Sequence, residues 1–184
     1  MHNRDSGWRG NPLPSLRNSA VWAGKPTEIP LVNAPVRADD APRLEDFPYR
    51  LSDNVRFADL DPNGHVNNAV YASYFETGRV TLVKDLSMGL MPAGLGWIMV
   101  RLDIHFRAEL HWPGQIELGL GLVKFGRTST TFDQVVFSEG RCVASAKAVT
   151  VMIDEVTRRP TPLPAEVKQN FRRWVRRGVN PDGE

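Results

Sequence analysis

Four segments of alternating hydrophobicity follow one another in the second half of the chain, separated by short turns rich in Gly and Pro. Apolar side chains at every second position are typical of strands that bury one face. The segments are residues 97–110, 115–124, 128–138 and 141–154. Because strands joined by such short turns pair with their neighbours, the pattern predicts a mostly antiparallel sheet.

The first of these segments has the most regular alternation. Its charged residues, such as Arg101 and Asp103, are expected to face outward and its apolar residues inward. The residues expected to face inward are Ile98, Val100, Leu102, Ile104 and Phe106.

One long helix is predicted upstream of these strands. Apolar residues fall at helical spacing from Asn68 to about Leu86, and Asn67 suits the N-cap position. Gly78 inside this helix indicates a close approach to a neighbouring element, because an interior Gly costs up to about 1 kcal/mol relative to Ala.

A fifth strand is predicted just before the helix. Residues 49–58 alternate, with Leu51, Val55 and Phe57 on one side. One helix set against a five-stranded, mostly antiparallel sheet is an α+β arrangement.

The remaining segments flank this predicted domain. Residues 1–48 hold seven of the fourteen prolines and show no sustained period, which predicts an extended N-terminal arm. Residues 165–177 have one apolar face and a basic remainder, and we expect a terminal helix packed on the domain rather than a nucleic-acid or membrane helix. The domain is therefore expected to span residues 49–177, with residues 178–184 as a tail.

Composition limits the function classes. The net charge of +2 offers no global argument for nucleic-acid binding, and no apolar run approaches the length of a membrane span. Cys142 is the only cysteine, so no intrachain disulfide forms, and we expect an inert thiol and a cytoplasmic protein. The four histidines show no close ligand spacing and no phosphate-binding loop occurs, so neither a metal nor a separate cofactor is expected.

The stretch from Asp61 to Asn68 carries most of the chemical information. It reads as a Pro/Gly turn between a strand and a helix, with the sequence Asp61-Pro62-Asn63-Gly64-His65-Val66-Asn67-Asn68. The first turn of a helix leaves backbone N–H groups unpaired and carries about half a positive charge, which suits a carbonyl oxygen becoming an oxyanion. With Asp61 as base or nucleophile, the stretch could perform acyl transfer, although the same residues are also ordinary turn formers.

These residues resemble the signature of hotdog-fold thioesterases, the group that contains 4-hydroxybenzoyl-CoA thioesterase. The resemblance continues at Tyr71, Tyr74, Phe75, Glu76 and Arg79, and it spans roughly residues 49–172. The Asp-x-Asn-x-His core is also similar to plant acyl-ACP thioesterases. The resemblance implies a single hotdog domain, in which a sheet of about this strand count wraps a long helix.

The resemblance also implies roles for the turn residues. Asp61 would be the carboxylate that attacks the carbonyl or activates a water, and Asn68 would offer its backbone N–H to the carbonyl oxygen. Asn63 and His65 match the proposed catalytic set of the plant enzymes. For His65, acid/base work and a hydrogen-bonded turn position remain equally open.

Substrate contacts are expected at two places. Tyr71, Tyr74 and Phe75 could line an acyl pocket, although core packing also explains at least two of them. Glu76 is a further candidate for substrate binding because the family pattern includes it, although a surface pair with Arg79 also explains it. The coenzyme A phosphates would meet a polar turn, for which hairpin polarity is the alternative explanation. The residues of this turn are Lys124, Arg127, Thr128 and Ser129.

The sequence therefore predicts an acyl-CoA thioesterase that acts as a homodimer or homotetramer, with coenzyme A as part of the substrate and no other cofactor. The absence of a Gly-x-Ser-x-Gly elbow removes the main competing hydrolase design. The alternatives are an acyl-ACP thioesterase, a non-hydrolytic acyl-CoA or acyl-ACP binding protein and, more weakly, a hotdog dehydratase.

Overall fold

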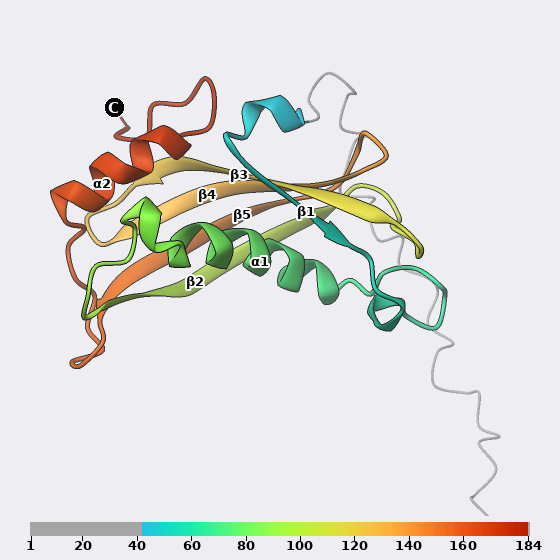
Figure 1. Ribbon diagram of the computed structural model, residues 1–184, viewed down its shortest axis with the longest axis horizontal. Coiled ribbons are helices and arrows are strands. Elements are labelled where there is room, and N and C mark those ends of the chain that lie inside the picture. The colour runs from blue at the N-terminus through green and yellow to red at the C-terminus, as the bar shows by residue number, and fades with distance from the viewer. Residues whose placement is uncertain (1–41, 184) are drawn as a thin grey trace, which may run out of the picture. The chain divides into compact units, whose positions relative to one another are not determined.

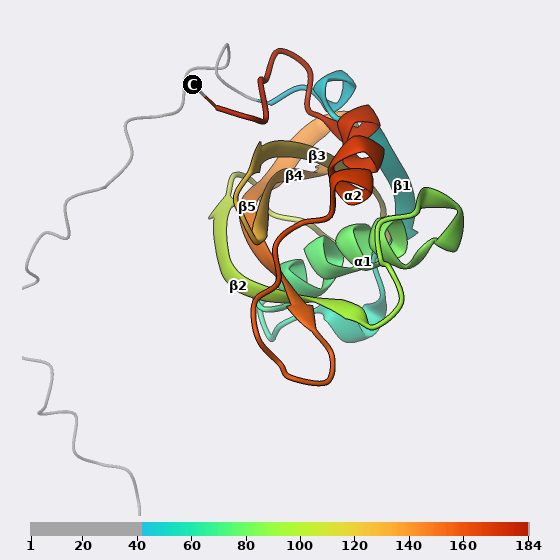
Figure 2. The same ribbon diagram turned by 90° about the vertical axis from the view of Figure 1, so that its left-hand side faces the viewer.

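The computed structural model describes residues 42–183, which form a five-stranded sheet around one long helix. The sheet order is β1-β3-β4-β5-β2, and every neighbouring pair is antiparallel. The strands are β1 (Tyr49–Asn54), β2 (Leu95–Phe106), β3 (Gln115–Phe125), β4 (Ser129–Ser138) and β5 (Arg141–Asp154). Helix α1 (Val70–Lys84) lies along one face (Figure 1), and the sheet curves around it (Figure 2). The predicted α+β hotdog fold is confirmed.

The core lies between α1 and the face of the sheet that curves around it. Tyr71, Phe75 and Leu82 of α1 are almost fully buried, and so are the alternate apolar residues of β3. Each such side chain contributes about 1.5–3 kcal/mol when fully buried. The close approach expected at Gly78 is not required by the packing, because a Cβ there would lie 3.6 Å from Nε2 of Gln134 in β4, an ordinary van der Waals contact.

The inward face predicted for β2 is wrong at two of its five residues. Ile98 and Val100 are 37% and 59% exposed, while Leu102 and Ile104 are partly buried against the core and the half-exposed Phe106 ring packs against the buried Tyr71 of α1. Two features explain the difference. A register shift between Met99 and Arg101 breaks the alternation, and β2 is the edge strand of the sheet, where α1 gives less cover.

The connection from β1 to α1 also differs from the prediction. The strand ends at Asn54 and a 3₁₀ turn, η3 (Phe57–Asp59), follows, so that Phe57 is 71% exposed and does not share a strand face with the buried Val55. The helix begins at Val70, with Ala69 as its N-cap. Asn67 instead forms a preceding turn, in which its side chain accepts the Ala69 N–H at 2.9 Å and its carbonyl accepts the Val70 N–H at 2.9 Å.

Residues beyond β5 pack on the domain. Helix α2 (Ala165–Phe171) buries Val167 and Phe171 completely, as expected for a domain-packed helix, but it ends before the predicted residue 177. A 3₁₀ turn, η5 (Arg172–Trp174), follows, and Arg176 then donates its N–H to the Leu122 carbonyl at 2.9 Å. No helix among residues 42–183 combines the length and apolar character needed to cross a membrane.

Little of the predicted N-terminal arm falls within the described residues. Residues 1–41 lie outside them. Of the rest, Phe47 is 1% exposed and packs with Val135 and Phe137 on the sheet.

Candidate active site

The turn between η3 and α1 is a closed loop with a defined backbone. Leu60 and Val66 form an antiparallel bridge, and Asp61 donates its N–H to the His65 carbonyl at 2.8 Å. Gly64 has φ +81°, a left-handed conformation that glycine adopts without a steric penalty, and its N–H reaches the Asp61 carbonyl at 3.0 Å. The loop therefore presents Asp61 and His65 side by side at its base.

The Asp61 carboxylate is held by the loop that it begins. Its Oδ1 accepts the backbone N–H of Asn63 at 2.8 Å and that of His65 at 3.3 Å. Its Oδ2 has only a long contact of 3.5 Å with Asn63 Nδ2. One oxygen therefore orients the group, while the other keeps acceptor capacity for a substrate or a water.

These hydrogen bonds also keep Asp61 ionised. Partial desolvation raises the pKa of Asp61, but the backbone hydrogen bonds from Asn63 and His65, the Asn63 side chain and the His65 ring together outweigh it. The pKa of Asp61 is therefore lowered from its usual value. At neutral pH this residue is a carboxylate.

Buried contacts anchor the loop on both sides. Val66 donates its N–H to the Leu110 carbonyl at 2.8 Å, and Asn67 donates to the Asp59 carbonyl at 2.8 Å. The Asp59 carboxylate, 9% exposed, accepts the Tyr74 hydroxyl at 2.6 Å, which ties η3 to the first turns of α1. Burial and this hydrogen bond raise the pKa of Tyr74. The sequence did not single out Asp59, because Asp59 and Asp61 lie two residues apart in the same connection. Only the hydrogen bond from Tyr74 to Asp59, which the fold creates, distinguishes the two acids.

The turn just before α1 offers a backbone donor that has no partner among the described residues. No acceptor for the Asn68 N–H lies among residues 42–183, and Asn68 itself is exposed. The neighbouring N–H groups of Asn67 and Ala69 are already bonded, to the Asp59 carbonyl and to the Asn67 side chain. The structure thus brings Asp61, Asn63, His65 and Asn68 together in one loop, and within residues 42–183 the Asn68 N–H is unpaired.

The aromatic residues expected in an acyl pocket lie in the core. Tyr71 and Phe75 are 3% and 1% exposed, and the Tyr71 ring packs edge-on against Phe106 with ring centroids 5.2 Å apart. Neither residue lines the two cavities described below. They hold α1 against the sheet.

Glu76 is exposed and lies at the rim of a mostly apolar cavity of about 140 Å³ between α1 and β2. Arg79 also borders it. This guanidinium is 5% exposed and donates to Gln134 Oε1 at 2.7 Å and to Met99 Sδ at 3.2 Å. Burial lowers the pKa of Arg79, although Glu76 opposes the shift. The other lining residues are Val80, Val83, Lys84, Met91, Trp97, Phe132 and Thr150.

A larger hollow of about 750 Å³ lies elsewhere and is unrelated to the loop. It is polar and open, and none of its lining residues falls between residues 59 and 76. Cys142, expected to be inert, is partly buried on β5, and burial raises the pKa of its thiol. Neither feature adds to the candidate site.

The predicted coenzyme A turn lies far from Asp61 within one chain. Lys124, Arg127, Thr128 and Ser129 surround the β3–β4 turn, whereas the opposite end of β3 pairs with the end of β1 that leads to the Asp61 loop. Ten residue steps separate Gln115 from Phe125, or about 33 Å along a strand. Figure 1 shows the turn near α2 and the C-terminal end of α1, at the opposite end of the sheet from the loop.

Comparison with known proteins identifies relatives of the chain. The model of the thioesterase-like superfamily matches residues 55–171, more than half of the chain. A thioesterase from Thermus thermophilus, solved with coenzyme A and zinc, is 31% identical with a TM-score of 0.60 and covers 70% of this chain and 94% of its own.

Two further relatives are more distant in sequence. A protein from Pseudomonas aeruginosa strain PAO1 is 24% identical with a TM-score of 0.67 and covers 76% of this chain and 99% of its own. An Aquifex aeolicus protein, named as a candidate esterase, is 24% identical over 110 residues, which are 58% of this chain and 86% of that protein.

Proposed function

The chain belongs to the thioesterase-like superfamily, and we propose that it hydrolyses acyl-CoA thioesters with Asp61 as the reacting carboxylate. The observation that carries this proposal is the state of Asp61. Two backbone N–H groups fix its Oδ1, its lowered pKa keeps it charged, and its Oδ2 retains acceptor capacity. A thioester carbonyl is activated enough for a carboxylate and a polarised oxygen to suffice without a serine triad.

The helix start supplies the polarising group in this proposal. The Asn68 N–H would donate to the carbonyl oxygen as negative charge develops there, with support from the positive end of α1. One oxyanion donor is typically worth about 10²–10³ in rate. Because this donor belongs to the backbone, no side-chain exchange at Asn68 removes it.

Two routes satisfy the chemistry. In the first, Asp61 Oδ2 bonds to the carbonyl carbon, the carbon–sulfur bond breaks, and the coenzyme A thiolate leaves; water then cleaves the mixed anhydride and regenerates the carboxylate. In the second, Asp61 takes a proton from water while the water oxygen bonds to the carbon, and the proton passes to the departing thiolate. Both routes need Asp61 ionised.

The mostly apolar cavity beside Glu76 is the proposed site of the acyl group. Its volume of about 140 Å³ is close to that of an engineered cavity of about 150 Å³ that holds one benzene molecule. We therefore expect short or single-ring acyl groups to react faster than long chains. The coenzyme A complex of the Thermus thermophilus relative supports a coenzyme A thioester rather than an acyl carrier protein.

A second copy of the chain is part of the proposal. Strand β2 has a partner strand on one side only among the described residues, and Ile98, Met99 and Val100 expose apolar side chains along it. Ser73, Glu76 and Val80 form an exposed stripe on α1, which the N-cap residue Ala69 extends. Antiparallel pairing of two β2 strands across a two-fold axis would cover both surfaces.

The same symmetry would complete the substrate site. An antiparallel pairing reverses the second sheet, so the β3–β4 turn of the partner subunit would lie at the Asp61 end of the first. Arg127 of the partner subunit could then meet coenzyme A phosphates bound near Asp61.

The test is a panel of acyl-CoAs of different length, with a thiol reagent that reports free coenzyme A. We expect turnover above background, fastest for short or single-ring acyl groups, and light scattering at no less than twice the 20.6 kDa chain mass. Tight binding with intact acyl-CoA recovered afterwards would refute hydrolysis and identify a binding protein. Turnover of acyl carrier protein thioesters alone would refute the coenzyme A assignment.

A further inference from the structure

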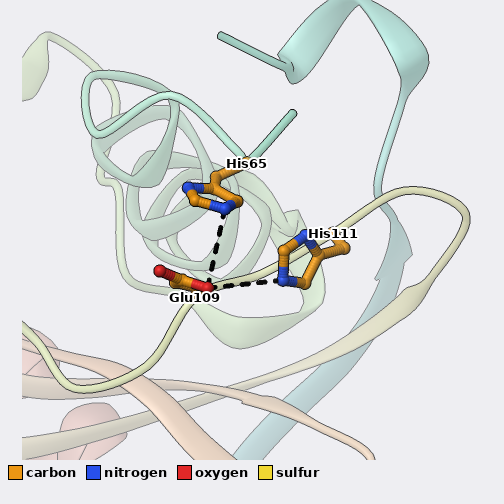
Figure 3. A group of neighbouring side chains, drawn as sticks. All are labelled: His65, Glu109 and His111. Atoms are coloured by element: carbon orange, nitrogen blue, oxygen red, sulfur yellow. Dashed lines mark ion pairs between the residues drawn. The ribbon is translucent and has the colours of Figure 1, made fainter. Parts of the chain in front are cut away.

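Two histidines and a glutamate converge beside the Asp61 loop. The sequence predicts no metal site, because its four histidines and one cysteine form no close metal-ligand pattern. The fold brings the ligand atoms of His65, Glu109 and His111 within 4.8 Å of one another, and no second group of this kind occurs among residues 42–183. Figure 3 shows both rings turned toward the carboxylate.

We propose that His65, Glu109 and His111 bind a zinc ion. The distances favour an ion over direct contact. His65 Nε2 and His111 Nε2 lie 3.6 and 3.7 Å from the same oxygen, Glu109 Oε2, too far for good hydrogen bonds. Ligands bonded at about 2.0–2.2 Å in a tetrahedron stand roughly 3.4 Å apart, so small side-chain rotations would complete the geometry.

A backbone contact prepares one ring for this role. His111 Nδ1 lies 3.4 Å from the Gly64 carbonyl oxygen, which can only accept a hydrogen bond. The proton of a neutral ring would therefore sit on Nδ1 and leave the lone pair on Nε2, the atom that faces Glu109. Histidines that bind metals commonly have such an orienting partner on the other ring nitrogen.

The backbone also fixes the ligands relative to one another. Glu109 and His111 flank Leu110, which is 3% exposed, and His65 precedes Val66, which is 5% exposed. The hydrogen bond from Val66 N–H to the Leu110 carbonyl, at 2.8 Å, joins the two buried residues and hence the two loops. Each ligand is thus next to a buried anchor.

The three ligand groups and their exposure to solvent favour a zinc ion that keeps one coordination position open. Two imidazoles and one carboxylate suit zinc, and this set, with water as the fourth ligand, occurs in catalytic zinc sites. The side chains of His65, His111 and Glu109 are 37%, 58% and 67% exposed, so an ion can enter from solvent. A bound ion would engage His65 and prevent that ring nitrogen from transferring protons.

Zinc binding is measured on the full chain without substrate, so its outcome does not depend on thioester hydrolysis. Chelator-treated protein is titrated with zinc chloride by calorimetry and with cobalt(II) by visible absorption. We expect one ion per chain with a dissociation constant of about 10 µM or below. His65→Ala, Glu109→Gln and His111→Ala should each weaken zinc binding at least about tenfold, with unchanged circular dichroism.

His105→Ala is the matched control, since this histidine does not belong to the proposed site, and it should bind zinc like the parent. The intense cobalt bands of a four-coordinate ion should appear with the parent and disappear in His111→Ala. Absence of saturable zinc binding would overturn the proposal. So would parent-like affinity in both Glu109→Gln and His111→Ala.

Discussion

Replacing Asp61 by Asn separates the chemical role of this residue from its structural role. The amide oxygen of Asn can still accept the N–H groups of Asn63 and His65, now 2.8 and 3.3 Å from Asp61 Oδ1. The loop and the melting temperature should therefore stay close to those of the parent. The exchange removes the negative charge that both catalytic routes require.

The expected loss follows from that charge. A general base contributes about 10²–10⁴ in rate, so kcat should fall at least about 10²-fold, or about 2.7 kcal/mol in the barrier. KM should change little, because Asp61 is not proposed to hold coenzyme A. Because the pKa of Asp61 is lowered, this carboxylate stays ionised at mildly acidic pH. The kcat of the parent should therefore not fall through protonation of Asp61 between about pH 5 and pH 8.

Steady-state release of coenzyme A provides the assay. Asp182→Asn makes the same exchange at an acid that pairs with Arg172 at 2.9 Å in the C-terminal tail, and it should keep the parent rate. If Asp61→Asn retains kcat within a few-fold of the parent, Asp61 is a turn residue only. Glu76 would then be the next carboxylate to test.

Two further exchanges test the stability of the fold, and a third tests the assembly of subunits. Tyr74→Phe removes the 2.6 Å hydrogen bond to the buried Asp59 and should lower the free energy of unfolding by about 1.5–3 kcal/mol, measured by urea denaturation. Gly78→Ala should stabilise by up to about 1 kcal/mol in the same assay, because the added Cβ meets Gln134 at an ordinary 3.6 Å; destabilisation would mean that the contact is tighter. Val100→Asp should convert the assembly to monomers in light scattering, whereas Val156→Asp, at a 90% exposed turn residue, should not.

Period-two patterns predicted the sheet well where strands are buried. In β3 the residues Ile116, Leu118, Leu120 and Leu122 are at most 3% exposed, as their alternation indicated. In β2 the same pattern failed at Ile98 and Val100, because alternation specifies two faces but not which face is covered. A register shift and an edge position depend on the neighbouring strand, which no local pattern reports.

The candidate site likewise contains residues that a local sequence pattern can predict and residues that it cannot. Asp61, Asn63, His65 and Asn68 are close in sequence, so one motif identified them together. Glu109 and His111 join His65 only because Val66 and Leu110 meet in the core, a long-range contact. The N-cap predicted at Asn67 was wrong, since the same kind of side chain can cap a helix or, as here, accept the N–H two residues ahead in a turn before the helix.

The distance between Asp61 and the β3–β4 turn leads to a test of shared sites. Because about 33 Å of strand separates the two ends of β3, Arg127 can assist Asp61 only across a subunit interface. Arg127→Glu alone should raise KM for acyl-CoA, and Asp61→Asn alone should lower kcat. In a mixed dimer of these two variants, one site carries both exchanges and the other carries neither.

Co-refolding equal amounts of Asp61→Asn and Arg127→Glu should therefore restore about a quarter of the parent rate at low substrate, since half of the dimers are mixed and each has one intact site. The reciprocal mixture, parent with the Asp61→Asn/Arg127→Glu double variant, should form mixed dimers with no intact site. If each chain carried a complete site, mixed dimers of Asp61→Asn and Arg127→Glu would have no intact site, and mixed dimers of the parent and the double variant would have one. Active mixed dimers in the reciprocal mixture alone would therefore refute a site shared between subunits.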